Sequence, residues 1–249
     1  MEQQFYQEYA IAETEHWWFV ARRQIIAKAL DSLHLNPDSD ILEVGCGPGG
    51  NLELLSRYGN VSALESDVGT REIANSRKIV QVEQGALPDN IPFGDNCFDL
   101  IAMFDVLEHI DDDAGALDVL HKRLRPDGIL LLTVPAYNFL WSHHDVVNQH
   151  KRRYTRKRLI KLAQDAGYQV AYSTYFNTLL FPLVLAVRLL EKLLHTSAGN
   201  EVEMPPKPLN VLLKHIFASE RILLPHLSLP FGVSIMVIAR KPRADTGRR

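Results

Sequence analysis

The stretch "ILEVGCGPGG", residues 41–50, decides the fold of this chain. Its apolar start and glycine-rich end are typical of a buried strand that leads into a ligand-binding turn and a helix. Two spacings fit the turn. G-x-G-x-x-G uses Gly45, Gly47 and Gly50, whereas E-x-G-x-G-x-G begins at Glu43 and ends at Gly49. Because the two spacings are typical of different ligands, the choice between them bears on the function.

Glu43 favours the second spacing. A dinucleotide places its pyrophosphate on the backbone amides at the helix N-terminus, where a neighbouring carboxylate is unfavourable. S-adenosylmethionine carries a sulfonium and an α-ammonium group instead of phosphates, and a carboxylate attracts both. We therefore interpret the turn as a site for S-adenosylmethionine, with glycines that let the backbone approach the ligand. A nicotinamide dinucleotide, and with it an NAD-dependent oxidoreductase, is the alternative.

Outward from this turn, short β-rich runs alternate with helical patterns, which is typical of a mostly parallel sheet covered by helices. The sequence therefore predicts an α/β, Rossmann-like, doubly wound fold with seven strands. The expected strands are residues 40–44, 61–64, 79–83, 98–103, 129–134, 168–174 and 233–240.

The segment between the last two expected strands is far longer than a hairpin loop. It contains the apolar "TLLFPLVLAVRLLEKLL" and the proline-rich "EMPPKPLN". We therefore expect three regions. These are a helical N-terminal extension at residues 1–35, a catalytic domain of residues 36–174 and 231–241, and an inserted apolar, helical subdomain at residues 175–230.

The composition indicates which classes of protein this chain can belong to. A chain of 249 residues with 46% hydrophobic residues can bury the core of a large α/β domain, and its net charge of −3 gives no reason to expect nucleic acid. Two cysteines, Cys46 and Cys97, are too few for a disulfide framework. The first fifteen residues contain four glutamates and no apolar core, which is not typical of a secretory signal. We expect a cytoplasmic protein.

Three blocks of sequence carry a family resemblance. They are "LEVGCGPG", "FDLIAMFDVLEHI" and "LRPDGILLLTVPA", in this order between residues 40 and 136. This third of the chain resembles the core of class I S-adenosylmethionine-dependent methyltransferases, of the branch that includes the ubiquinone-biosynthesis O-methyltransferases. The resemblance implies S-adenosylmethionine as cofactor and methyl transfer, with O-methylation of a small or lipid-linked acceptor as the expected reaction.

The resemblance also implies donor-binding residues. The methionine end of the donor would lie at Glu43, Gly45, Cys46, Gly47 and Gly49. The ribose would bind Glu65 beside Ser66, and Phe104 and Asp105 would flank the donor. Many relatives carry an acidic residue for the adenine where this chain has Ala86. Here the backbone amides around Ala86 and Leu87 are expected to hold the adenine.

The acceptor is expected beyond the carboxyl ends of the fourth and fifth strands. The segments that follow them contain His109, His144 and His150, and a histidine suits the removal of a proton from an acceptor. We predict these three as catalytic candidates, with a structural role as the alternative for each. The spacing of "HHD" and the later histidine fits no defined metal motif, so no metal is expected.

A basic run, "KRRYTRKR" at residues 151–158, is expected to turn Arg152 and Arg153 toward an anionic group on the acceptor, with a solvated face as the alternative. No aromatic-rich module accompanies this run, so nucleic acid is not the expected partner. The aromatic "HWWF" at residues 16–19 predicts either a lid over the donor or core packing.

The apolar run at residues 179–187 is shorter than the ~20 residues that span a bilayer. It predicts either a buried helix or an exposed apolar face. The exposed face would contact the inner membrane surface, line a channel for a lipid-like acceptor, or form a homodimer. A protein that binds the donor but serves only as a catalytically silent scaffold at the membrane surface is a further alternative.

Overall fold

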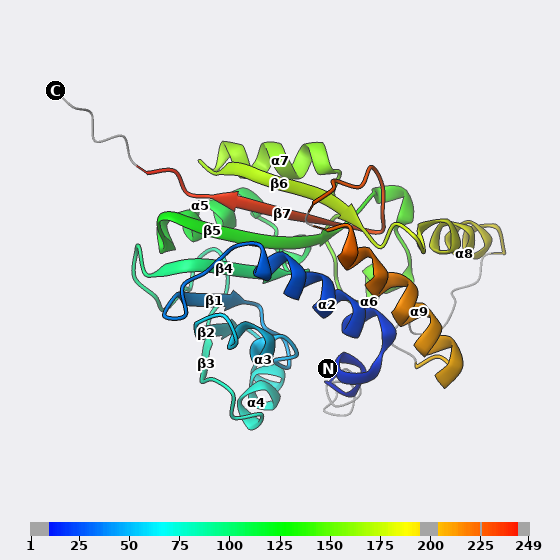
Figure 1. Cartoon of the computed structure of the whole chain (residues 1–249), viewed down its shortest axis with the longest axis horizontal. Coiled ribbons are helices and arrows are strands. Elements are labelled where there is room, and N and C mark those ends of the chain that lie inside the picture. The colour runs from blue at the N-terminus through cyan, green and yellow to red at the C-terminus, as the bar shows by residue number, and fades with distance from the viewer. Residues whose placement is uncertain (1–9, 195–203, 225, 244–249) are drawn as a thin grey trace.

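A seven-stranded sheet organises the computed structural model, which describes residues 10–194, 204–224 and 226–243 (Figure 1). The strand order is β3-β2-β1-β4-β5-β7-β6, and β7 alone runs antiparallel to its neighbours. The strands are β1 Asp40–Val44, β2 Asn60–Glu65, β3 Val82–Gln84, β4 Phe98–Phe104, β5 Leu124–Pro135, β6 Gln169–Phe176 and β7 Ser234–Arg240. The predicted Rossmann-like fold is confirmed. The third strand begins three residues later than predicted, where Val82 pairs with Ala63.

Helices cover both faces of the sheet, as the continuous apolar runs in its strands require. On one face Leu42, Ile101 and Leu132 pack in a cluster that includes Leu117 of α5 and Leu159 of α7. On the other, neighbouring strand residues form a second cluster with α2 and α9. The helices are α2 Trp17–Asp31, α3 Leu52–Leu55, α4 Val68–Ser76, α5 Asp113–Arg123, α6 His143–Val147, α7 Arg156–Asp165, α8 Phe181–Leu194 and α9 Lys207–Ser219.

The segment between β6 and β7 supplies α8, α9 and the short helix η3 Glu220–Ile222. Helix α9 lies beside α2 (Figure 1), where Phe217 packs on Trp17 with ring centroids 6.0 Å apart. The side chain of Asn210 also accepts a hydrogen bond from the Trp17 backbone N–H at 2.8 Å. The N-terminal helix and the inserted segment therefore contact each other directly.

Parts of the predicted regions lie outside the described residues, namely residues 1–9 of the N-terminal extension and residues 195–203 and 225 of the insertion. Within the described ranges, no helix combines the length and apolar composition that crossing a bilayer requires.

Candidate functional site

A cavity of about 910 Å³ lies where the parallel strands end. The residues that follow β1, β2, β4 and β6 contribute to its wall, as ligand sites of open α/β sheets do. Helix α2 and the segment before it line a second side, and α8 and the start of the α9 segment line a third. Regions from all three parts of the sequence therefore meet around one space.

The turn needs a glycine at each of its four glycine positions. Gly45, Gly47 and Gly49 have φ angles of 66°, 56° and 85°, a left-handed conformation that favours glycine. Gly50 is not among the residues with positive φ, but an added Cβ there would lie 2.6 Å from a carboxylate oxygen of Glu13. At Gly45 there is also no room for a side chain, because an added Cβ would lie 2.7 Å from a methyl carbon of Val106. The backbone therefore accommodates both predicted spacings.

Glu65 connects the second strand to this turn. Its carboxylate accepts hydrogen bonds from the backbone N–H groups of Gly47 and Asp67, both at 2.9 Å. Glu65, Ser66, Gly45, Cys46 and Gly47 line the cavity. Burial raises the pKa of the Cys46 thiol, and nearby carboxylates raise it further, so this residue is not a reactive thiolate.

Glu43 lies beneath the turn instead of at the cavity wall. Its side chain is 1% exposed and accepts a hydrogen bond from the Asn51 side-chain amide at 2.9 Å. Burial raises the pKa of Glu43 to about 8. Asn51 does line the cavity, and it lies between the Glu43 carboxyl group and the cavity. The structure therefore supports an indirect role for Glu43, through Asn51, rather than the predicted direct contact.

Three further predicted positions do not line the cavity. The backbone N–H of Ala86 donates to the carbonyl of Asn90 at 2.8 Å, so the amide expected to face the adenine is used within its own turn. Leu87 packs against the main hydrophobic cluster. A Cβ on Gly49 would meet Leu52 at 2.9 Å, which indicates that Gly49 serves close packing of the turn.

The N-terminal segment contributes Glu13 and Arg22 to the cavity wall, and of these two Glu13 had no signal in the sequence. Glu13 is 5% exposed, hydrogen-bonds with the backbone of Gly50, and lies 3.5 Å from Arg77. Arg22 forms an ion pair with Asp105 and stacks over Trp18 at 4.5 Å from the ring centroid.

Trp17, Trp18 and Phe19 all line the cavity, as do Phe104 and Asp105. The core packing that was one of the two expectations is present, because Trp17 and Trp18 pack against the second hydrophobic cluster and Phe19 is buried, and the lid over the donor stays a prediction.

The predicted histidines come together at the cavity wall, where the ring of His150 contacts the rings of His109 and His144. His109, His144 and His150 line the cavity. Nδ1 of His150 lies 2.8 Å from Oδ1 of Asp145, which orients the ring. Arg153 holds the same carboxylate through Nε at 2.7 Å and Nη2 at 2.9 Å.

Asp145 is fully buried. Burial alone would raise its pKa, but the hydrogen bonds from His150 and Arg153 outweigh burial and hold the pKa of Asp145 below its usual value. The aspartate therefore remains charged beside His150.

The basic run is largely paired with carboxylates. Arg152 lies 2.8 Å from Asp113, and Arg153 is bound to Asp145. Arg152 does not line the cavity, whereas Arg153 does and is bound to Asp145 there, so a contact of Arg153 with an anionic acceptor stays a prediction.

Helix α8 lines the cavity with polar and apolar residues and exposes further leucines on its outer face. Arg188 and Glu191 form an ion pair at 2.9 Å and line the cavity with Leu183, Val184 and Val187. On the outer face Leu190 is 54% exposed and Leu193 is 74% exposed. No residue of α8 is buried. The alternative of a buried helix is wrong, and the exposed apolar face is what the structure contains.

Comparison with known proteins points to one family. The sequence profile described as a methyltransferase domain matches residues 15–173. A relative from Mycolicibacterium smegmatis, named as an S-adenosylmethionine-dependent methyltransferase, is 29% identical over 160 residues, or 63% of this chain and 61% of the relative. The mitochondrial ubiquinone biosynthesis O-methyltransferase of Candida albicans is 28% identical over 123 residues, or 45% of this chain and 38% of the relative.

The chain spans less than two thirds of the length of these relatives. Among solved structures, the complex between the Haloferax volcanii Trm112 methyltransferase activator and a methyltransferase contains a chain with the same fold. Its TM-score is 0.65, at 15% identity, with 98% of this chain and 97% of that chain covered.

Proposed function

Because this chain belongs to the methyltransferase domain family, we propose that its cavity binds S-adenosylmethionine and that the protein transfers the methyl group to an acceptor. The observation that carries the proposal is that one cavity of about 910 Å³ is lined by the glycine turn and Glu65 as well as by the histidines and α8. Donor and acceptor would therefore share one space, and such positioning accounts for much of the catalysis of a displacement reaction.

We propose a hydroxyl group as the acceptor. The oxygen attacks the methyl carbon, the carbon–sulfur bond breaks with its electrons left on sulfur, and the hydroxyl proton passes to a base. His150 suits this role because Asp145 fixes its Nδ1 and leaves Nε2 as the second ring nitrogen. The side chains of Leu183, Val184 and Val187 favour an apolar or lipid-linked acceptor next to these histidines.

Native mass spectrometry of the purified chain tests the ligand, because an S-adenosyl compound and a nicotinamide dinucleotide differ in mass. An acceptor screen that measures formation of S-adenosylhomocysteine then tests the reaction. Bound nicotinamide would contradict the proposal. Donor binding without product from any hydroxyl-bearing acceptor would favour the silent scaffold.

Glu65→Ala is expected to weaken S-adenosylmethionine binding by about 1.5–3 kcal/mol, the contribution of a hydrogen bond to a charged group. The variant loses the proposed ribose contact and also the acceptor that holds the Gly47 amide. Isothermal titration calorimetry measures the change. Glu43→Ala, which acts through Asn51, is expected to weaken binding in the same direction.

Glu83→Ala is the matched control, because Glu83 is an exposed carboxylate on the neighbouring strand β3. It should bind the donor as the parent does. If a folded Glu65→Ala bound as tightly as Glu83→Ala, the assignment of the ribose end would be wrong.

We further propose that the outer face of α8 contacts the membrane surface. Leu189, Leu190, Leu193 and Leu194 of α8 are each more than half exposed, whereas a helix on a water-facing surface usually exposes polar side chains. Lys192 of α8 is exposed and carries a charge that suits anionic head groups, although its ammonium group also donates a hydrogen bond to the carbonyl of Phe139 at 2.8 Å. A lipid-linked acceptor would then enter the cavity beside Leu183.

Vesicle flotation tests this contact. The parent is expected to float with phosphatidylglycerol vesicles at low salt, and Leu190→Glu should weaken vesicle partitioning by about 10-fold or more, since burying one leucine contributes about 1.5–3 kcal/mol. Val68→Glu adds the same charge at an exposed apolar position on α4 and should float as the parent does. If the parent protein does not float with vesicles of any lipid composition, the membrane contact is wrong, and a second copy of the chain is the remaining candidate partner for this face.

A further inference from the structure

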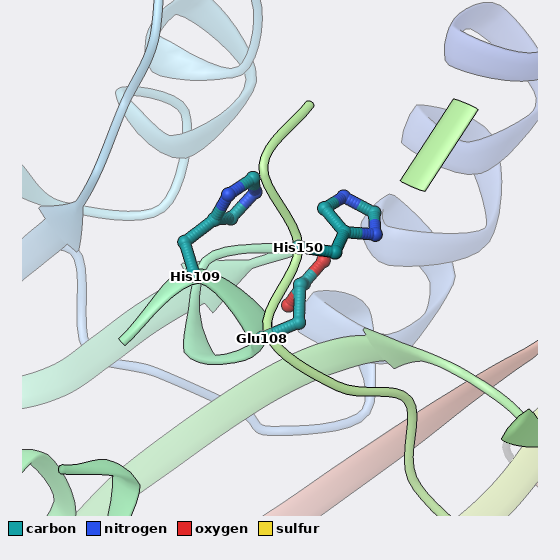
Figure 2. A group of neighbouring side chains, drawn as sticks. All are labelled: Glu108, His109 and His150. Atoms are coloured by element: carbon teal, nitrogen blue, oxygen red, sulfur yellow. The ribbon is translucent and has the colours of Figure 1, made fainter. Parts of the chain in front are cut away.

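Glu108, His109 and His150 form a cluster that the proposed function does not fully use (Figure 2). Glu108 and His109 belong to the short helix η1 Leu107–His109 after β4, whereas His150 follows α6. The backbone N–H of Lys151 donates to the carbonyl of Glu108 at 2.8 Å and fixes the two segments together. One carboxylate oxygen and one nitrogen from each ring lie within 4.8 Å of one another.

Glu108 is the unusual member of this cluster. Its side chain is fully buried, and neither carboxylate oxygen has a hydrogen-bond partner within the described part of the chain. Arg22 and Arg153, whose charges act on Glu108, are engaged with Asp105 and Asp145. A carboxyl group buried in this way is stabilised either by taking up a proton or by binding a cation. Glu108 also lines the cavity, so a cation could reach it.

Both histidines are held in the way that metal-binding histidines are. The Nδ1 atom of His150 is bound to Asp145, and the ring of His109 hydrogen-bonds with the backbone of Asn148. A carboxylate or backbone carbonyl on one ring nitrogen fixes the ring and leaves the other nitrogen for a metal. The two rings are nearly perpendicular, with centroids 4.7 Å apart, so they do not stack.

We propose that Glu108, His109 and His150 bind one divalent first-row transition metal ion, such as Zn²⁺. Two imidazoles and a carboxylate are a donor set that such ions accept, and the remaining positions would face the cavity. At bond lengths of about 2.2 Å, two ligand atoms lie at most about 4.4 Å apart, so small side-chain rotations close the observed group. This proposal replaces the expectation from the sequence that no metal is bound.

The proposed metal ion would also take part in the proposed methyl transfer, and this catalytic role rests on the proposed function. The ion would coordinate the acceptor hydroxyl and favour loss of its proton. Nε2 of His150 would then be a ligand instead of the base, and the proton would pass to water in the cavity, because burial lowers the pKa of His144 to about 4. The methyl carbon would still be attacked by the acceptor oxygen, with the electrons of the broken bond left on sulfur.

The test is metal binding by the full chain, after removal of any affinity tag and treatment with a chelator. Calorimetric titration with Zn²⁺ should give one site, and Co²⁺ should give the visible absorption of an ion bound by nitrogen and oxygen. Glu108→Gln, His109→Gln and His150→Gln are each expected to weaken Zn²⁺ binding by roughly 100-fold or more. His143→Gln is the matched control, because His143 is exposed, lies on the same helix as Asp145 and is not part of the cluster.

A parent that binds S-adenosylmethionine but no Zn²⁺, or a Glu108→Gln variant that binds Zn²⁺ as tightly as His143→Gln does, would overturn the site. A parent that binds Zn²⁺ but not S-adenosylmethionine would overturn the proposed function and leave the metal site standing. If the cation takes part in the reaction, chelation should abolish turnover and Zn²⁺ should restore it. Turnover unaffected by chelation would overturn the catalytic role.

Discussion

His150→Ala is expected to lower turnover by about 10² to 10⁴ while S-adenosylmethionine affinity changes little, as removal of a proton-transfer group does. The ring lies at the proposed acceptor end of the cavity, and Asp145 orients it at 2.8 Å. The loss is expected whether His150 takes the proton or binds a metal ion. Formation of S-adenosylhomocysteine, with the best acceptor from the screen, measures turnover, and calorimetry measures donor affinity.

His143→Ala is the control for this prediction. His143 is one residue from His144 on α6, but its side chain is exposed and it does not line the cavity. It should retain the turnover of the parent. Equal turnover in His150→Ala and His143→Ala would reduce His150 to a structural residue and remove the proposed chemistry from this end of the cavity.

Asp145→Ala is expected to lower the free energy of unfolding by about 3–5 kcal/mol, because it leaves the guanidinium of Arg153 buried without an opposite charge. Asp145 is fully buried, and Arg153 is 5% exposed. The carboxylate also accepts a hydrogen bond from the Ser142 backbone N–H at 2.8 Å, which caps α6. Urea denaturation followed by circular dichroism measures the change.

Two further variants separate the causes of that loss. Ser142→Ala removes only part of the cap and should cost about 0.5–2 kcal/mol. Replacing the pair together, Asp145→Leu with Arg153→Met, should recover much of the stability, since a buried ion pair can often be exchanged for apolar side chains. A double variant as unstable as Asp145→Ala would show that the unpaired charge is not the cause.

The sheet could be predicted because its signals are local. The central strands β1, β4 and β7 are short apolar runs that are largely buried, and the turn at residues 41–50 carries glycines where the backbone needs positive φ. The third strand was misplaced because Ile79 and Val80 are apolar without being in it; they pack against a small cluster beside the strand. An apolar run predicts burial, but pairing with a neighbour decides where a strand begins.

The site was only partly predictable. Gly45, Gly47 and Glu65 could be assigned to the cavity wall from their places at strand ends. Glu43 could not, because its place beneath the turn depends on the side chain of Asn51. Glu13 gave no signal, since its contact with Gly50 joins residues that are far apart in the sequence.

The sequence by itself determined the succession of strands and turns along the chain and the glycine positions of the turn after the first strand. Through three matching blocks it also indicated the family of this chain. The tertiary structure alone decided which charged groups are paired and which face of α8 is exposed. In the folded chain Arg153 is bound to Asp145, Arg188 lines the cavity and Leu193 is exposed. The tertiary structure also brings Glu108 beside His150. The reason is physical. The pattern of polar and apolar residues predicts which residues are buried, but the partner that compensates a buried charge comes from another segment of the chain. That segment reaches its place only when the helices pack on the sheet.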